Sequence, residues 1–299
     1  MSRNISGFSS VLIVMMIFLS RPAAADQCDD LRDPEPRIAA CTKSINSGKW
    51  KGKNQAINYN NRGNAYQAKG DNDRAIADYN QAISLDPKYA LAYNNRGIAY
   101  NEKGDNDRAI ADYNQAISLD PKYAKAYYNR GNAYKAKGDN DRAIADYNQA
   151  ISLDPKSSNS YFNRGRSNLY AGSVAKALAD LNQASALAPK YAYAALWLDI
   201  VSQRNNLPSR LPQTSSQLDM TAWPAPVVRL FMGQMTPGAL LAAADNPDAT
   251  TKRDQVCEAN FYIGELSLMK GSKDEATRLF RLAASGCPHG FVEWGCCQC

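Results

Sequence analysis

A 34-residue unit, present three times in succession between residues 56 and 157, constrains the fold of this chain more than any other feature. The block KGDNDRAIADYNQAISLDPK is identical at residues 69–88, 103–122 and 137–156, so the period is unambiguous. A repeat of this length is the signature of units that bury their apolar faces against their neighbours. The chain is therefore predicted to form a solenoid, which needs no single central core.

Each unit contains the pattern of two helices. The first, over residues 56–69, has apolar side chains at helical spacing and ends at Gly70. The second begins at Asp71, whose side chain can cap free backbone N–H groups, and ends before Pro87 because proline cannot continue a helix. Its apolar residues form a broad stripe that suits a helix packed on two neighbours. The predicted fold class is therefore all-α.

The small and aromatic residues of the unit recur at fixed offsets. They are Tyr59, Gly63, Tyr66, Ala75, Tyr79, Ala82 and Pro87 in the first unit, and the next two units repeat them 34 and 68 residues later. A fourth set is Tyr161, Gly165, Gly172, Ala177, Leu181, Ala184 and Pro189. This pattern resembles the tetratricopeptide repeat (TPR) family. The resemblance implies a right-handed α-solenoid of helix-turn-helix units, with four units over residues 56–189.

The first 25 residues have the pattern of a secretory signal peptide. Arg3 precedes an apolar run at residues 11–19, and three alanines end at Ala25, where cleavage is expected. An uncleaved anchor is the alternative, although the run is short for a bilayer span. The chain is therefore predicted to be periplasmic or secreted and not membrane-embedded after cleavage. Disulfides can form in that environment.

The charge balance excludes nucleic acid as an expected partner. Without Arg3 and Arg21 the chain has 33 basic residues against 29 acidic ones, and no run of lysines or arginines occurs. Nucleic-acid binding proteins usually concentrate a much larger positive charge on one face. The charges of this chain are predicted to form an ordinary solvated surface.

Residues 26–55 are predicted to form a capping half-unit. Alignment with the second helix of the repeat puts Cys41 where Tyr79 points inward, and a disulfide to Cys28 would fix the preceding segment. The spacing is not C-x-x-C, which favours a structural bond over a redox role. Residues 257–290 restore the repeat register as a further TPR-like unit, with Cys257 and Cys287 at adjoining ends of a helical hairpin. We expect these two cysteines to form a second disulfide.

Two regions lie outside the repeat register. In the irregular helical segment 190–256, the apolar residues either pack on the solenoid or line a ligand pocket; they are Trp223, Phe231, Met232 and Met235. In the Cys-rich tail 291–299, three cysteines near His289 are either metal ligands or part of a frayed or frame-damaged end; they are Cys296, Cys297 and Cys299. A small-ligand or metal-binding protein is thus the alternative function.

No convincing catalytic set is present in the sequence. His289 is the only histidine, and the repeated Gly-Asp-Asn is a turn between helices rather than a phosphate loop. The chain is predicted not to be an enzyme and to need no cofactor. The charged residues that recur in each unit have a structural explanation instead. We expect Arg96 to pair with an aspartate such as Asp112. In the last unit both positions change together, to Ile263 and Leu279.

The TPR resemblance implies that the first helices line a concave surface that binds peptides or partner helices. The first helices differ between units whereas the second helices are identical, so variation falls where a partner would touch; drift after duplication is the alternative. The predicted partner-binding residues are Asn60, Asn61, Asn64, Asn95, Lys125, Tyr128, Asn129, Phe162 and Asn163. The asparagines would read a peptide backbone, and Tyr128 and Phe162 would be apolar anchors.

Some of these positions correspond to a peptide-binding arrangement known in the TPR family. Five positions fall at the spacing of the carboxylate clamp of chaperone-binding members, but Asn60 and Asn129 replace a lysine and an arginine. Strong recognition of a C-terminal carboxylate is therefore not expected. The predicted function is that of an exported scaffold or adaptor that holds another protein or peptide in its concave groove, in processes of the cell envelope.

Overall fold

The computed structural model describes residue 28 and residues 32–287. The predicted signal peptide (1–25) and Cys-rich tail (291–299, with Cys296, Cys297 and Cys299), together with His289, lie outside the described residues. Within the described part the chain forms fifteen α-helices and one short 3₁₀ helix, with no strand. The all-α prediction is confirmed.

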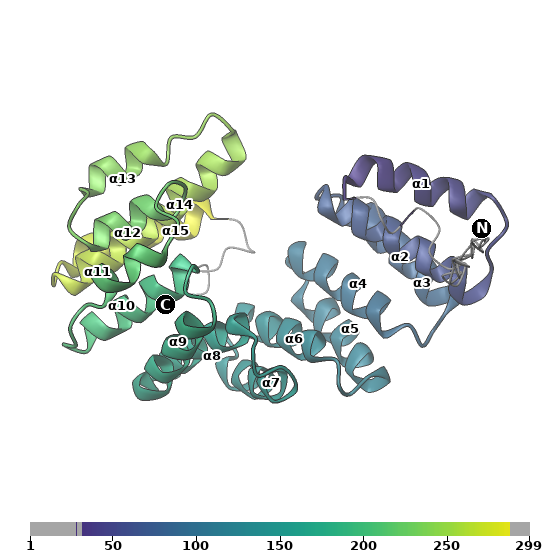
Figure 1. Ribbon diagram of the computed structural model, residues 1–299, viewed down its shortest axis with the longest axis horizontal. Helices are drawn as coiled ribbons and strands as arrows, with labels where there is room; N and C mark the ends of the chain where they lie inside the picture. The colour runs from purple at the N-terminus through teal and green to yellow at the C-terminus, as the bar shows by residue number, and fades with distance from the viewer. Residues whose placement is uncertain (1–27, 29–31, 288–299) are drawn as a thin grey trace, which may run out of the picture.

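The repeat region consists of helices that alternate between a first and a second helix of each unit. They are α1 (Pro34–Asn46), α2 (Gly52–Ala68), α3 (Asn72–Leu85), α4 (Ala90–Glu102), α5 (Asn106–Leu119), α6 (Ala124–Ala136), α7 (Asn140–Leu153), α8 (Ser158–Tyr170), α9 (Val174–Leu187) and α10 (Ala192–Arg204). Each helix packs on the next one along the chain, which makes the molecule a helical solenoid (Figure 1).

The described helices that follow α10 vary in length. They are α11 (Leu211–Thr214), η1 (Ser215–Gln217), α12 (Ala225–Phe231), α13 (Pro237–Ala243), α14 (Ala249–Met269) and α15 (Lys273–Gly286). We refer to α11–α15 as the C-terminal module. Among the described residues, no helix combines the length and the apolar character needed to cross a bilayer.

The turns within each unit follow from the residues that were identified in the sequence. The side chain of Asp105 accepts a hydrogen bond from the backbone N–H of Arg108 (3.0 Å) and so caps α5. Gly104, just before it, has φ +79°, a conformation that suits glycine because it lacks a Cβ. Asp71 and Asp139 cap α3 and α7 in the same way. Local sequence therefore sets the start of the second helix in the first three units.

The repeated glycine in the first helix allows the two helices of a unit to approach closely. A Cβ added to Gly97 would lie 2.6 Å from the Tyr113 ring, and one added to Gly63 would lie 2.6 Å from the Tyr79 ring. Both tyrosine rings are fully buried, so they have little room to move away. The Gly–Tyr pair thus fixes the spacing of the helices within a unit.

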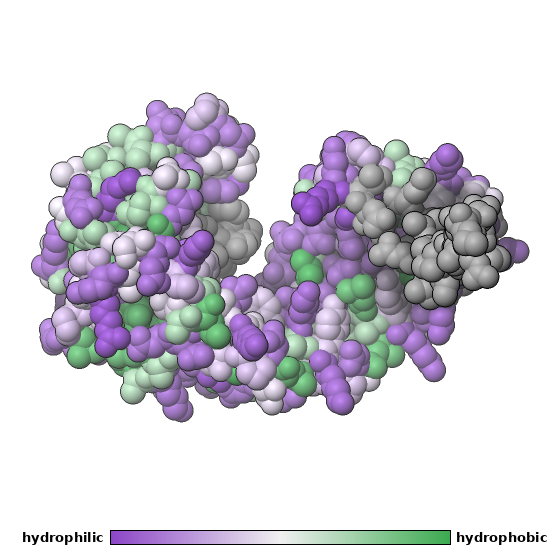
Figure 2. Space-filling model, in the orientation of Figure 1, coloured by the Kyte–Doolittle hydropathy of each residue, from purple (hydrophilic) through white to green (hydrophobic). Residues whose placement is uncertain are grey.

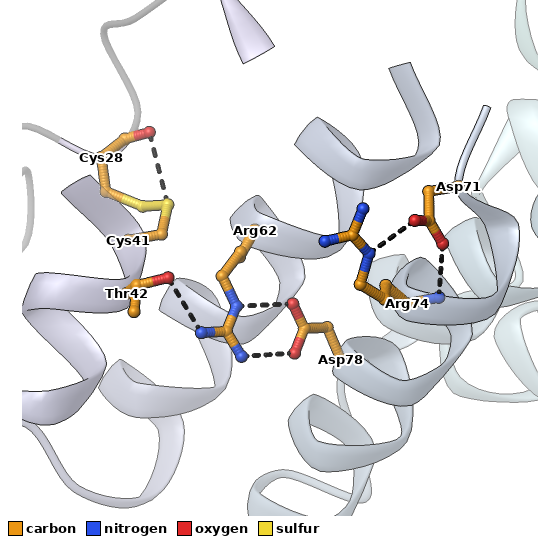
Figure 3. Close-up of polar contacts among 7 residues, drawn as sticks. All are labelled: Cys28, Cys41, Thr42, Arg62, Asp71, Arg74 and Asp78. Carbon is orange, nitrogen blue, oxygen red and sulfur yellow. Dashed lines mark hydrogen bonds and ion pairs between the residues drawn. A yellow bond between two sulfur atoms is a disulfide. The ribbon is translucent and has the colours of Figure 1, made fainter. Parts of the chain in front are cut away.

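The first described helix, α1, occupies the register of a second helix. Thr42 accepts a hydrogen bond from Arg62 (3.0 Å), just as Asn80 accepts one from Arg96 (2.6 Å) in the next unit. Cys41 is fully buried and forms a disulfide with Cys28, with a Cα–Cα distance of 5.0 Å (Figure 3). The bond ties Cys28, which is 2% exposed, to α1.

The last helical hairpin differs from the prediction at its start. Helix α14 begins at Ala249 rather than near Cys257, because Asp248 caps it by accepting a hydrogen bond from the backbone N–H of Thr251 (2.7 Å). Cys257 therefore lies inside the helix, where it forms a disulfide with Cys287 at a Cα–Cα distance of 5.5 Å. This bond ties α14 to the end of α15.

The whole molecule is curved. Helices α6–α9 form the middle of the curve, and the C-terminal module and the first units rise on its two sides (Figure 1). The space-filling view shows an open hollow between these two sides (Figure 2). Any partner that binds inside the curve would reach this hollow.

Candidate partner-binding surface

The first helices lie on the inner side of the curve. The first helix contacts the first helix of the next unit in three places: α2 with α4, α4 with α6 and α6 with α8. Elements on the inside of a curved stack are closer together than those on the outside, which places the first helices along the hollow. We call the inward side of α2, α4 and α6 the inner surface.

Charged pairs hold the two helices of each unit in register. The Arg96 guanidinium donates two hydrogen bonds to Asp112, Nε to Oδ2 at 2.8 Å and Nη2 to Oδ1 at 2.6 Å. The same bidentate pair, sixteen residues apart, occurs in the other units: Arg62–Asp78, Arg130–Asp146 and Arg164–Asp180. Figure 3 shows it for Arg62. These hydrogen bonds raise the pKa of the Arg96 guanidinium.

A third bond from each arginine links neighbouring units. Arg96 reaches Asn80 of the preceding second helix (2.6 Å), and Arg130 reaches Asn114 (2.6 Å). In the last unit, Ile263 and Leu279 replace the pair and are both buried. The arginines therefore serve the scaffold and leave the inner surface to other residues.

The repeated asparagines form hydrogen bonds from one unit to the next. The Asn95 side-chain amide donates to Asn60 and to Asn64, both at 3.0 Å. Asn129 donates to Asn94 (2.9 Å), and Asn163 donates to the Tyr128 hydroxyl (2.9 Å). We call this series the asparagine ladder. It joins the first helices of consecutive units and so stabilises the stack itself.

The ladder contradicts part of the predicted role of the asparagines. Asn60, Asn95 and Asn163 have exposed fractions of 1%, 9% and 7%, and their amides are bonded inside the protein. They are therefore poorly placed to read a peptide backbone. Asn61, Asn64 and Asn129 are only half-buried, so part of each side chain is accessible.

The predicted role of Phe162 as an apolar anchor for a partner does not fit its burial. Its side chain is 2% exposed, and its ring packs edge-on against Tyr191 at a centroid distance of 5.4 Å. The Arg166 guanidinium carbon lies 5.6 Å from the centroid of the same ring. The sequence could not reveal this because the covering residues come from the next unit.

Lys125 and Leu91 are the most accessible side chains on the inner surface. They occupy the same position in consecutive units, 34 residues apart, and Lys125 is exposed while Leu91 is 39% exposed. Sequence reasoning missed Leu91, although its exposure as a large apolar side chain in a variable first helix was a usable signal. Tyr128 is half-buried one helical turn after Lys125.

The inward positions of α2, α4 and α6 are mostly amide or apolar residues, and burial, together with the nearest carboxylate, that of Glu102 at the end of α4, raises the pKa of Tyr79. The residues at helical spacing along α2, α4 and α6 are Ile57, Asn60, Asn64, Gln67, Leu91, Asn94, Ile98, Asn101, Lys125, Tyr128, Asn132 and Lys135. Two of them are cations, and the rest are neutral. The surface is thus amide-rich with a positive end at α6.

The irregular segment packs on the solenoid. The Trp223 indole N–H donates to Glu258 of α14 (2.7 Å), and the Phe231 ring lies 6.0 Å from the Tyr262 ring in an edge-on arrangement. Met232 and Met235 are partly buried against the same core. Of the two interpretations of these four residues, the structure favours packing over a ligand pocket.

Across residue 28 and residues 32–287, no group of three or more His, Cys, Asp or Glu side chains is arranged to hold a metal ion. The cysteines Cys296, Cys297 and Cys299 lie outside these residues.

Comparison with known proteins agrees with the repeat pattern. Residues 63–104 and 97–138 each match the family described as TPR repeat, and residues 124–157 match the family described as tetratricopeptide repeat. A tetratricopeptide repeat protein from Parabacteroides merdae has a TM-score of 0.56 and 16% identity, over 85% of this chain and 87% of that one. This likeness shows a shared helical solenoid.

Two further solved structures are similar over part of the chain. YrrB, described as a TPR protein with an unusual peptide-binding site, has a TM-score of 0.50 and 20% identity, over 66% of this chain and all of YrrB (100%). MamA has a TM-score of 0.49 and 27% identity, over 56% of this chain and 98% of MamA. With three consecutive units matched directly by the family, the chain belongs to the tetratricopeptide repeat family.

Proposed function

We propose that this protein is an interaction scaffold that holds an extended segment of a partner protein along the inner surface of α2, α4 and α6. The observation that carries the proposal is the contrast between the two faces of the repeats. In three units the second helix and its flanking turns form an identical block of twenty residues, whereas the first helices differ and expose Leu91 and Lys125. YrrB, which shares the fold, is described as having a peptide-binding site.

The chemistry of the inner surface indicates the kind of segment that fits. Amide side chains can donate to and accept from a peptide backbone, and Leu91 offers an apolar contact. Lys125 and Tyr128 at the α6 end favour a segment that is neutral or acidic there. Asn61, Asn64 and Asn129 complete the proposed contact set. No catalytic step is part of this function.

We also propose that the protein acts outside the cytoplasm, in the cell envelope. The pattern of residues 1–25 and the two disulfides, Cys28–Cys41 and Cys257–Cys287, support this location. The partner would then be an envelope protein.

Placing negative charges on the inner surface should abolish capture of the partner. The double variant Leu91→Glu with Lys125→Glu places two carboxylates at the most accessible inner positions, where they would repel an acidic segment and remove the apolar contact. We expect partners captured from an envelope extract to fall at least tenfold, measured by quantitative mass spectrometry. Neither side chain makes a hydrogen bond that the fold requires, so helical circular dichroism should not change.

The control variant carries the same change of charge on the outer surface. Ala111→Glu with Lys122→Glu lies on and just after α5, at exposed positions. Capture should match that of the unmodified protein. Equal capture by the inner and outer variants would exclude the inner surface as the binding site.

A further inference from the structure

The second repeat unit differs from its neighbours at one inward position of its first helix. Helix α4 has Ile98 where the units before and after it have an asparagine, Asn64 and Asn132. All three side chains are half-buried. The isoleucine removes an amide oxygen from this row, and that oxygen accepts hydrogen bonds in both neighbouring units.

In the first unit the Asn64 oxygen lies between two donors. It accepts a hydrogen bond from the Tyr79 hydroxyl of the second helix (2.8 Å) and another from the Asn95 amide of the next unit (3.0 Å). The oxygen therefore joins a buried tyrosine to the asparagine ladder.

The third unit repeats this arrangement. The Asn132 oxygen accepts hydrogen bonds from the Tyr147 hydroxyl (2.8 Å) and from the Asn163 amide of the next unit (3.3 Å). In both units a tyrosine hydroxyl and the amide of the following unit converge on one oxygen. The second unit has the same two donors, Tyr113 and Asn129, around Ile98.

The Tyr113 ring occupies the same place in its unit as the Tyr79 ring does in the first. A Cβ added to Gly97 would lie 2.6 Å from Cε1 and 3.1 Å from Cζ of Tyr113. The same two distances from Gly63 in the first unit are 2.6 Å and 3.1 Å. Tyr113 and Ile98 pack in one cluster. The Tyr113 hydroxyl therefore lies beside a side chain that has no atom able to accept a hydrogen bond.

The second acceptor that the first unit offers its tyrosine is also missing. Gln67 accepts a hydrogen bond from Tyr79 (2.9 Å), whereas its counterpart Asn101 bonds to Asn106 (2.6 Å). In the described part of the chain, the Tyr113 hydroxyl forms no hydrogen bond, and the residue is 1% exposed. A donor in so buried a residue is unfavourable unless an acceptor reaches it.

Asn129 lacks the matching bond at the same place. Its amide donates to Asn94 (2.9 Å) and, among the described residues, to no second acceptor. By comparison, Asn95 donates to both Asn60 and Asn64 (3.0 Å each). Asn129 is half-buried, so part of its side chain is accessible. The tyrosine hydroxyl and this amide thus form a pair of donors beside Ile98.

The surroundings of the two donors are apolar only in this unit. Leu91 lies seven residues before Ile98, which is two helical turns along the same face of α4, and it is 39% exposed. The first unit has an asparagine at the later of these positions, and the third unit has a lysine and an asparagine. Among α2, α4 and α6, only α4 is apolar at both.

We propose that the second unit is a carbonyl-binding subsite, in which Tyr113 and Asn129 donate hydrogen bonds to one main-chain carbonyl oxygen of the partner segment. The partner's oxygen takes the role that the asparagine oxygen has in the neighbouring units. Leu91 and Ile98 contact an apolar side chain next to that carbonyl. The inference deepens the function proposed above and rests on it.

The charge at this place favours a neutral carbonyl over a carboxylate. Burial, and then the Glu102 carboxylate, raise the pKa of the Tyr113 phenol, so the hydroxyl stays protonated and remains a donor. A partner carboxylate would bring a second negative charge to a group on which Glu102 already acts. A main-chain carbonyl is neutral, and its two lone pairs accept from both donors.

Peptide binding by purified variants tests the subsite. The probe is a displayed library of random twelve-residue peptides, selected on the unmodified protein and against the inner-surface variant Leu91→Glu with Lys125→Glu. Affinities of the selected peptides are then measured by fluorescence polarisation. Tyr113→Phe removes one hydroxyl that is unbonded in the protein, so it should weaken binding about fivefold and leave the fold unchanged.

Two further variants separate the subsite from a general effect of substitution. Tyr147→Phe is the matched control, because that hydroxyl is already bonded to Asn132, and it should change the affinity less than twofold. Ile98→Asn supplies the amide oxygen from within the protein and occupies both donors. It should weaken binding at least tenfold. If Ile98→Asn fails to fold, Tyr113→Phe decides alone.

Ester replacement identifies the carbonyl itself. Each amide of a selected peptide is replaced in turn by an ester, whose carbonyl oxygen is a weaker acceptor. One replacement should weaken binding to the unmodified protein and have no effect on binding to Tyr113→Phe. Equal affinity of the unmodified protein and Tyr113→Phe would overturn the subsite and leave the inner surface as the binding site. If no peptide distinguishes the unmodified protein from the Leu91→Glu with Lys125→Glu variant, the subsite and the proposed function both fail.

Discussion

Replacing Asp112 with leucine is expected to lower the free energy of unfolding by about 3 kcal/mol, because it leaves the Arg96 guanidinium in a mostly buried site without its carboxylate. The Asp112 side chain is 8% exposed and that of Arg96 is 19% exposed, so solvent compensates little. Urea denaturation followed by circular dichroism measures the change.

The double variant Arg96→Ile with Asp112→Leu should be less destabilised than the single Asp112→Leu variant. It reproduces the apolar pair that the last unit uses at the same positions, Ile263 and Leu279, which are 5% and 3% exposed. An apolar pair of suitable volume can replace a buried ion pair at little cost. We expect a coupling energy of about 2 kcal/mol in the double-mutant cycle, and additive effects would contradict the structural role of the pair.

An exposed ion pair provides the control for this experiment. Asp107 pairs with Lys137 of the next unit, and its side chain is 82% exposed. Replacing Asp107 with leucine should change the free energy of unfolding by less than about 1 kcal/mol, since exposed ion pairs contribute little. The two aspartates lie in the same helix, so the comparison isolates the effect of burial.

Removing the disulfide between Cys257 and Cys287 is expected to destabilise the C-terminal module by about 3 kcal/mol. The bond closes a loop with a sequence separation of 30, and a loop of this length restricts the unfolded chain substantially. The variant is Cys257→Ala with Cys287→Ala, studied under oxidising conditions. Hydrogen exchange should show lower protection in α14 and α15.

The loss should be local, because each unit of a solenoid is stabilised mainly by its neighbours. Protection in α4 and α5 should be unchanged in the same variant. Equal loss of protection throughout the chain would mean that the molecule unfolds as one cooperative body. Removing Cys28 and Cys41 instead should affect α1 and α2 and leave α14 unchanged.

Much of the fold was predictable because the residues that determine the helices and turns of a unit lie within that unit. Asp105 as a helix cap, Gly104 in the turn and the close Gly97–Tyr113 contact all follow from residues within one period. The arginine–aspartate pairs were also predictable, since both members change together in the last unit. Local chemistry and an exact period are sufficient for features of this kind.

The roles of the inner residues were less accessible from the sequence. The period shows that Asn95 recurs, but the amide bonds run to residues 35 and 31 positions earlier, and only the packing of adjacent helices determines these partners. Phe162 was misjudged for the same reason, since Tyr191 of the next unit covers it.

The position of α14 depends on contacts between residues far apart in the sequence. The pair Trp197 and Phe261, for example, is separated by more than sixty residues and carries no shared local pattern. One signal was present: Trp197 stands 34 residues after Asn163, where the ladder would have its next asparagine, and its ring lies next to Arg166 and to Phe261 of α14. A break in a regular ladder thus marked a change in what covers the surface.

Site-specific photo-crosslinking measures most directly whether the partner lies on the inner surface. A photoreactive residue is placed at Leu91 or Lys125 inside the curve, and at Ala77 or Ala111 outside it, all exposed positions. The account predicts that the same partner protein is crosslinked from both inner positions and from neither outer one. Crosslinking of that partner from the outer positions, with none from the inner ones, would contradict it.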